Sequence, residues 1–299
     1  MPGCRLPGAS GPAAAAGEDG GVDASPTSWQ VGCTLGFQVE EAATIALQVA
    51  VAGSPGRTVD DRLDVTLDGQ PLTVDEIAAP RGGRIHRLLA TPGLLQARYE
   101  ARATDPGPGG GSGDGQGDAA LERLVALRPS RYCPSDALLG FAAGELGRRP
   151  PDADLARDVV AWVAGRVSYT LGASGPLDTA IETLLTGQGV CRDFAHLAIA
   201  LGRAAGIPAR LVAAYAPGLT PMDFHAVVEV HVDGAWHVFD PTRLAPRPSL
   251  LRIATGRDAA DTAFADVLSG VATLTTMEVR AVLDGTLPWD DGVALVSLG

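Results

Sequence analysis

Hydrophobic and polar positions alternate along the first third of the chain with the period of two that is typical of β-strands. Residues 63–67 alternate in this way and are followed by Asp68-Gly69, a pair that tolerates the positive φ angles of a hairpin turn. Similar short apolar runs continue to about residue 99. We therefore predict a β-rich N-terminal domain over residues 29–104.

In the second half of the chain the hydrophobic period changes to that of amphipathic helices. The predicted helices cover residues 139–146, 155–167, 179–185 and 191–205. Gly206 and Pro208 follow the last of them, which is a usual stop signal for a helix. Beyond Pro208 the period returns to two, so strands complete this part of the chain.

Two segments contain too few large side chains to bury a core. Residues 1–28 are rich in Gly, Ala, Pro and Ser, and residues 105–118 are dominated by Gly. We expect a flexible extension in the first and a linker in the second. The remaining residues, 119–299, are then predicted to form one catalytic domain.

Composition and charge exclude several classes of partner. Hydrophobic residues make up 46% of the chain and charged residues 19%, which is typical of a globular protein. The net charge is −12, lysine is absent and no basic run occurs. Nucleic acids and anionic membranes bind clusters of cations, so neither is an expected partner.

The cysteines indicate neither a metal site nor a disulfide framework. Cys4, Cys33, Cys133 and Cys191 lie far apart and form no CxxC pair. We expect no metal and no cofactor. The chain also lacks an apolar run long enough for an export signal or a membrane span, which favours a cytoplasmic location with reduced thiols.

Cys191 is the strongest candidate for a nucleophile. It begins a predicted helix within the segment TGQGVCRDFAHL, which starts at Thr186. Free backbone N–H groups and the helix dipole favour the thiolate at such a position, and the same N–H groups can stabilise an oxyanion. Gln188 is a weaker candidate donor, for which a loop hydrogen bond is the simpler role.

A predicted hairpin brings a histidine and an aspartate together. Asp233-Gly234 is the expected two-residue turn, so the numbers of paired residues sum to 467. In this register His225 and Asp240 are diagonal neighbours on one face of the ribbon. The carboxylate can hold the imidazole in one tautomer while the other ring nitrogen addresses Cys191.

Each of these residues also has an ordinary structural interpretation. A lone cysteine in a helix of small residues is usually just buried, and an aspartate before a proline often stabilises a turn. These interpretations do not explain the shared face of His225 and Asp240, so we predict that they form a triad with Cys191. His196 lies about 140° from Cys191 around the helix and is read as structural.

The segments GVCRDFAHLAIALGRAAGIPARLV, DFHAVVEV and WHVFDPTR resemble the transglutaminase-like superfamily, relatives of the papain-fold enzymes. The resemblance places Cys191, His225 and Asp240 at the family's catalytic positions. It implies an α+β fold, in which a helix bundle bearing the cysteine packs on an antiparallel sheet bearing the histidine and aspartate, with a β-rich domain before it. Members of the family often have an aromatic residue two positions after the histidine, as in HAW. This chain has His225-Ala226-Val227 at that place.

The resemblance implies acyl chemistry on a peptide, protein or small amide, through a thioester on the cysteine. Hydrolysis and acyl transfer use the same catalytic residues. The resemblance to bacterial relatives, which are more often likened to proteases than to cross-linking enzymes, leads us to expect a protease or amidase. The main alternative is a non-catalytic module that keeps the groove and binds peptides. The acyl acceptor and the oligomeric state do not follow from the sequence.

Overall fold

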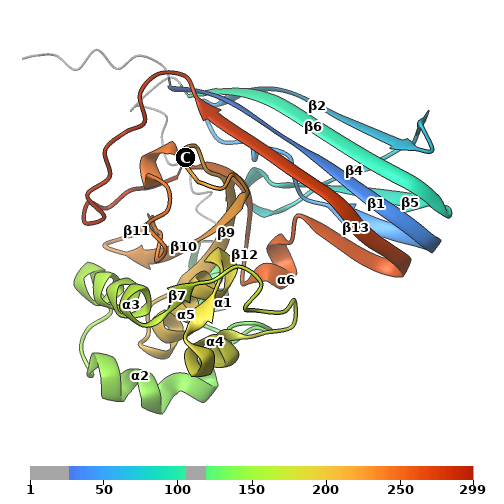
Figure 1. Ribbon diagram of the computed structural model, residues 1–299. Helices are drawn as coiled ribbons and strands as arrows, with labels where there is room; N and C mark the ends of the chain where they lie inside the picture. The colour runs from blue at the N-terminus through green and yellow to red at the C-terminus, as the bar shows by residue number, and fades with distance from the viewer. Residues whose placement is uncertain (1–26, 106–118, 299) are drawn as a thin grey trace, which may run out of the picture.

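Two antiparallel sheets and a set of helices make up the protein, as Figure 1 shows, and the computed structural model describes residues 27–105 and 119–298. The larger sheet has seven strands, in the order β3-β2-β6-β1-β5-β4 with β13 on the other side of β1. Its strands are β1 (Thr27–Leu47), β2 (Thr58–Leu67), β3 (Gln70–Pro71), β4 (Asp75–Ala78), β5 (Arg84–Ala90), β6 (Gly93–Asp105) and β13 (Ala265–Leu283).

Alternation of side chains explains the core of this larger sheet. In β1 the odd-numbered residues from Trp29 to Val39 are buried and apolar, while the even-numbered residues between them, Gly32 apart, are exposed or half-buried. The predicted hairpin turn is confirmed, because Asp68 and Gly69 have φ values of 49° and 78° and Leu67 pairs with Gln70. A second reversal joins β4 and β5 at η1 (Pro80–Gly82).

The smaller sheet has four strands in the order β11-β10-β9-β12. These strands are β9 (Ala209–Tyr215), β10 (Phe224–Val232), β11 (Ala235–Phe239) and β12 (Leu251–Gly256). Asp233 and Gly234 form the turn of the β10–β11 hairpin with positive φ angles, and Val232 pairs with Ala235. The register that the sequence predicts is therefore confirmed over 228–239.

Helices cover one face of the smaller sheet. They are α1 (Ala119–Val125), α2 (Leu139–Leu146), α3 (Ala153–Arg166), α4 (Ala180–Thr186) and α5 (Cys191–Ala204), with the short α6 (Ala259–Thr262) after β12. Two short 3₁₀ turns, η2 (Ser135–Leu138) and η3 (Arg247–Ser249), and a pair of two-residue parallel strands, β7 (Ser168–Tyr169) and β8 (Gln188–Gly189), complete the elements. The four predicted helices are present with shifts of one or two residues at their ends.

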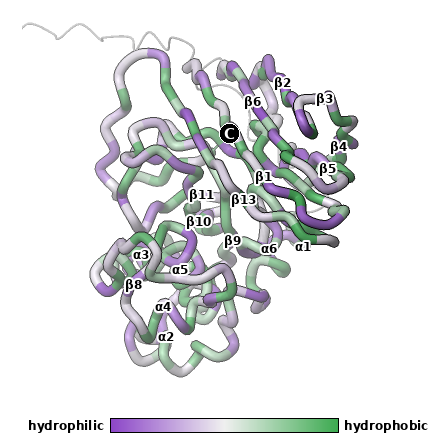
Figure 2. Tube along the Cα trace, turned by 45° about the vertical axis from the view of Figure 1, so that its right-hand side comes forward, coloured by the Kyte–Doolittle hydropathy of each residue, from purple (hydrophilic) through white to green (hydrophobic). Residues whose placement is uncertain are grey.

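The two sheets meet along β9 and β12. The hydroxyl of Tyr215 donates to the carbonyl of Val49 at 2.7 Å, and its ring stacks on Tyr99. A backbone bond of 2.9 Å joins Ala52 to Arg252. Figure 2 shows hydrophobic positions along β9, where the core of the larger sheet continues into that of the smaller one.

The last long strand returns to the first sheet. Residues 119–299 are the predicted catalytic domain, yet β13 pairs antiparallel with β1 from Trp29↔Leu283 to Leu47↔Ala265. The pairing covers one edge of β1 that β5 and β6 leave open. Of the predicted extension 1–28, only Thr27 and Ser28 are described, and both belong to β1; residues 106–118 of the predicted linker lie outside the described residues.

The predicted α+β fold class is confirmed. A β-rich N-terminal sheet accompanies a core in which helices pack on an antiparallel sheet. The longest described helices, α3 and α5, have 14 residues each, and none in the described ranges is long and apolar enough to cross a membrane.

Candidate active site

Cys191 is the first residue of α5, and the preceding turn is fixed on both sides. Gly187, with φ 64°, ends α4 in the left-handed conformation that favours glycine. The Asp193 carboxylate accepts the backbone N–H of Val190 at 2.8 Å, which caps the start of α5. Arg192 extends this support by donating to the carbonyl of Gly175 at 2.7 Å. The thiol thus stands at a helix start whose position is set by side-chain hydrogen bonds.

The three described cysteines differ in exposure. Cys33 and Cys133 are buried, whereas Cys191 is partly exposed. Burial raises the pKa of Cys33 to about 11, and burial likewise raises the pKa of Cys133. Within the described residues, the partly exposed thiol is therefore the one at the start of α5.

His225 and Asp240 are in contact on the smaller sheet. Nε2 of His225 lies 2.8 Å from Oδ2 of Asp240, and both side chains are buried. The second carboxylate oxygen accepts the backbone N–H of Thr242 at 2.9 Å and its hydroxyl at 2.7 Å. The contact agrees with the diagonal relation that the hairpin register predicts. The catalytic roles of the two residues remain predictions.

The electrostatics of this pair favour a charged imidazole. Burial disfavours the cation, but the Asp240 carboxylate outweighs burial and, with a smaller effect of the Cys191 thiol, raises the pKa of His225 to about 10. Burial also raises the pKa of Asp240, yet the His225 cation and the two bonds from Thr242 bring it below its usual range. The two side chains therefore stabilise each other as an ion pair.

The second ring nitrogen of His225, Nδ1, takes no part in the bond to Asp240 and is available to interact with Cys191. Nδ1 is buried and has no hydrogen-bond partner within the described ranges. The Cys191 side chain acts on the same ring, since it helps to raise the pKa of His225. An unpaired ring nitrogen beside a thiol is the arrangement that proton transfer between the two requires.

Sequence reasoning missed three residues around this pair. Thr242 fixes the Asp240 carboxylate, and the turn-forming sequence Asp240-Pro241-Thr242 is a signal that points to it. Asp223 and Tyr169 also lie near the site, because the Asp223 carboxylate interacts with the charge of His225 and the Tyr169 hydroxyl interacts with Cys191. Nothing in the hydrophobic pattern indicates either of them.

His196 has a structural environment, as its helical position predicts. Its Nε2 accepts the backbone N–H of Ala259 at 3.1 Å, and its ring stacks on Tyr132 with centroids 5.1 Å apart. Burial lowers its pKa to about 4, so the ring is neutral at physiological pH. In the described ranges, no group of three or more His, Cys, Asp or Glu residues is arranged to hold a metal ion.

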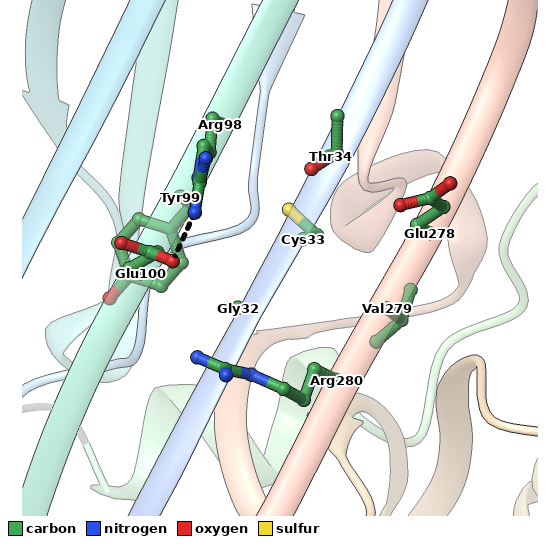
Figure 3. A pocket seen from close by; sticks show the side chains of 9 residues that line it. All are labelled: Gly32, Cys33, Thr34, Arg98, Tyr99, Glu100, Glu278, Val279 and Arg280. Atoms are coloured by element: carbon green, nitrogen blue, oxygen red, sulfur yellow. Dashed lines mark hydrogen bonds and ion pairs between the residues drawn. The ribbon is translucent and has the colours of Figure 1, made fainter.

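A separate pocket lies on the larger sheet, and Figure 3 shows the side chains around it. It is formed by β1, β6 and β13, and it contains none of the three predicted catalytic residues. Gly32 is one of its lining residues, and a Cβ atom there would come within 2.5 Å of the Tyr99 carbonyl oxygen. The backbone at this position therefore leaves no room for a side chain. Arg98 and Glu100 pair at 2.8 Å beside it.

Comparison with known proteins shows which family this chain resembles. Residues 141–241 match the family model described as the transglutaminase-like superfamily. The crystal structure of a candidate cysteine protease from Cytophaga hutchinsonii is 33% identical in sequence. It covers 91% of this chain and 96% of its own, with a TM-score of 0.80.

Two uncharacterized mycobacterial proteins are also similar. The one from Mycobacterium leprae is 26% identical over 146 residues, which is 46% of this chain, and the one from Mycobacterium tuberculosis is 30% identical over 120 residues, or 40% of this chain. The matched regions span 52% and 38% of these two relatives. This chain thus spans only about half, or less, of the length of each mycobacterial relative.

Proposed function

This chain belongs to the transglutaminase-like superfamily, and from that premise we propose that it is a cysteine hydrolase that cleaves amide or peptide bonds through a thioester on Cys191. It is homologous to a candidate cysteine protease over nearly its whole described length, which favours hydrolysis over acyl transfer. The substrate is a peptide, a protein or a small amide.

In the proposed reaction the thiolate of Cys191 attacks the carbonyl carbon of the amide. A C–S bond forms, and the electron pair of the C=O π bond moves to the oxygen. As this tetrahedral intermediate collapses, the C–N bond breaks and protonated His225 donates its Nδ1 proton to the leaving nitrogen. The products of this half of the reaction are an amine and an acyl-enzyme.

Water resolves the thioester in the second half. Neutral His225 takes a proton from the water, whose oxygen attacks the thioester carbonyl and displaces the thiolate. Asp240 holds the imidazole by the 2.8 Å bond to Nε2, so that Nδ1 faces the reacting atoms throughout. An amine in place of water would give acyl transfer with the same residues.

One observation carries the proposal, namely the buried imidazole that is bonded to a carboxylate on one nitrogen and unpaired on the other. Two further facts support it. The partly exposed thiol begins a helix, whose dipole favours the thiolate, and that thiol acts on the same imidazole.

The first test needs no knowledge of the substrate. Iodoacetamide is reacted with the full chain at about pH 6, where an ordinary thiol of pKa about 8.5 is almost wholly protonated. Alkylation of each cysteine is followed by mass spectrometry in the native chain and in His225→Ala. Cys33 and Cys133 are internal controls for burial.

We expect Cys191 to be alkylated at least about 10-fold faster than the other cysteines, and His225→Ala to remove this advantage. Equal rates at all cysteines, or an advantage that persists in His225→Ala, would contradict the proposed mechanism. In that case a peptide-binding module without catalysis is the better description of the chain.

A further inference from the structure

Strand β13 is an edge strand of the larger sheet. It has 19 residues and pairs with β1 along one side, while its other side pairs with no strand in the described part of the chain (Figure 1). An open edge presents backbone N–H and C=O groups to which a further strand can bond. β13 is therefore a surface on which another chain can add to the sheet.

Bulges divide β13 into two parts. The pairing with β1 is interrupted at four places between Ala265 and Thr276, and Gly270 has a φ of 79° in that stretch. Bulges twist an edge away from other strands, which is one way in which proteins protect it. From Thr276 to Leu283 the pairing with β1 runs without interruption. The second part is thus regular enough to accept another strand.

The charges on this regular part are arranged for pairing with a second copy of the same strand. Residues 276–283 contain no proline, and Met277 and Val282 are 39% and 48% exposed. The charged residues there are Glu278 and Arg280, and both are exposed. Like charges on an edge would repel a second copy, but these two have opposite signs and flank Val279 symmetrically. The edge is therefore complementary to itself.

Both charged groups are available to a second copy. Neither Glu278 nor Arg280 forms a hydrogen bond or an ion pair with another residue of the described ranges, whereas Arg98 and Glu100 on β6 pair with each other at 2.8 Å. Figure 3 shows the Arg280 side chain lying across Gly32, and its exposed position allows it to turn toward the edge. An ion pair with a second copy therefore breaks no existing one.

We propose that residues 276–282 form a self-association surface, on which two copies of the chain pair antiparallel about Val279 and join their larger sheets. A two-fold axis perpendicular to the sheet keeps both buried faces on one side, so opposed residues share a face. Glu278 then lies opposite Arg280 of the second copy, and Arg280 opposite its Glu278, which gives two ion pairs. Val279, which packs against the core of the larger sheet, lies opposite Val279 of the second copy.

The mass of the chain in solution tests whether it associates. The full chain is measured by light scattering after gel filtration, at about 1 to 100 μM and with a reducing agent so that thiols do not cross-link. We expect the mass to rise from the 30.5 kDa of one chain toward twice that value as the concentration increases. The mass of a single chain at every concentration would overturn the proposal.

Reversal of the two charges tests the register. Glu278→Arg brings two cations opposite each other on each side of Val279, and Arg280→Glu brings two anions together in the same way. We expect each variant alone to weaken association by at least about 10-fold. The double variant Glu278→Arg/Arg280→Glu restores opposite charges and should associate as the native chain does. An equimolar mixture of the two single variants should do the same, because each then faces its opposite charge.

Arg62→Glu is the matched control. Arg62 pairs with Asp64 at 2.7 Å on β2, on the side of the sheet away from β13, and is exposed. It changes the net charge as much as Arg280→Glu does and should leave association unchanged. An equal loss of association in Arg62→Glu and Arg280→Glu would show that net charge, and not the edge of β13, controls association.

Two further outcomes would overturn pairing about Val279. One is association that persists in both single variants, and the other is a failure of the double variant and of the mixture to restore it. Circular dichroism checks that every variant is folded, and the double variant decides the register if one single variant is not. The alkylation of Cys191 plays no part in this test, so the inference stands or falls separately from the proposed function.

Discussion

His225 and Asp240 are joined by a 2.8 Å hydrogen bond between Nε2 and Oδ2, across a hairpin that separates them by 15 residues. The bond uses up one ring nitrogen and raises the pKa of the imidazole, so the remaining nitrogen carries a proton over most of the physiological pH range. Asp240→Asn keeps the shape of the side chain but removes its charge.

We predict that Asp240→Asn slows acetylation of Cys191 by p-nitrophenyl acetate about 10³-fold, because the imidazole loses both its charge partner and its fixed tautomer. Asp233→Asn is the matched control, since it lies in the turn of the same hairpin at φ 51°, where asparagine is tolerated. Comparable rates in the two variants would show that Asp240 only stabilises the hairpin.

Cys191→Ala is expected to abolish release of p-nitrophenolate above the uncatalysed rate while leaving the melting temperature within a few degrees of the native value. Its side chain is small, partly exposed and not part of the apolar core. Cys133→Ala, the control, removes a buried thiol and is expected to lower stability but retain activity. Release that persists in Cys191→Ala would exclude this sulfur as the nucleophile.

The dependence of stability on pH provides a test of His225 that needs no activity. Its folded-state pKa is about 10, above the value of about 6.5 for an unfolded chain. The native state therefore binds the proton more tightly, and this contribution to stability is complete below about pH 6.5 and is lost as the pH rises through about 10.

We expect the free energy of unfolding, measured with urea, to fall between about pH 7 and pH 10 in the native chain. His225→Gln is expected to show a smaller fall over the same range, because glutamine does not titrate. Equal slopes in the two proteins would mean that the imidazole is not held as a cation.

Glu229 should control stability at the acid end of the scale. It is buried on β10, where its carboxylate accepts Arg252 Nη2 at 2.6 Å and Arg210 Nε at 2.8 Å. Burial alone would raise its pKa, but the two guanidinium groups outweigh burial and lower it to about 2. Since the unfolded value is about 4.3, its contribution is present above that pH and is lost as the pH falls through 2.

We predict that the free energy of unfolding falls by about 3 kcal/mol between about pH 5 and pH 2 on account of this residue. Glu229→Gln should flatten that part of the curve and should cost about 3–5 kcal/mol at neutral pH, because two buried cations lose their partner. Urea unfolding at several pH values checks both. A variant as stable as the native chain at pH 7 would refute the prediction.

A substitution at Gly189 tests whether the hydrogen-bonded cap of α5 holds Cys191 in place. A Cβ atom at this position would lie 2.6 Å from the Cβ of Asp193, whose carboxylate caps α5 through Val190. We predict that Gly189→Ala lowers stability by about 1–3 kcal/mol and slows alkylation of Cys191, because the start of the helix must shift.

Gly165→Ala is the control for the effect of alanine itself. Gly165 lies within α3, and a Cβ atom there would meet no atom within 4 Å. Alanine should stabilise the helix by about 0.5–1 kcal/mol and leave Cys191 unaffected. If Gly189→Ala behaves in the same way as Gly165→Ala, the capping of α5 does not depend on the close approach.

Local signals explain how much of the fold the sequence predicts. Helix α5 could be located to within a residue because Gly206 and Pro208 stop it, and the hairpin register followed from the turn at Asp233-Gly234. The contact of His225 with Asp240 then required only the geometry of one ribbon. These features depend on residues that are near each other in the chain.

Features that depend on distant pairing could not be predicted. The two-residue strand β7 has no periodicity, so nothing indicated that Tyr169 lies beside Gly189. The alternation in β13 indicates a strand but not its partner, because β1 offers no complementary charge pattern that selects it. Tertiary contacts determine the partners of both β7 and β13, and the hydrophobic period of a strand carries no information about its partner.

The pairing of β1 with β13 has a consequence for biosynthesis. Gln30 and Asp284, 254 residues apart in sequence, are hydrogen-bonded at 3.1 Å where the two strands lie together. Translation at about 5–20 residues per second separates the emergence of these strands by roughly 10–50 seconds. Throughout that interval the edge of β1 that β13 later covers is open to pairing with other chains, so folding of β1 depends on protection by a chaperone.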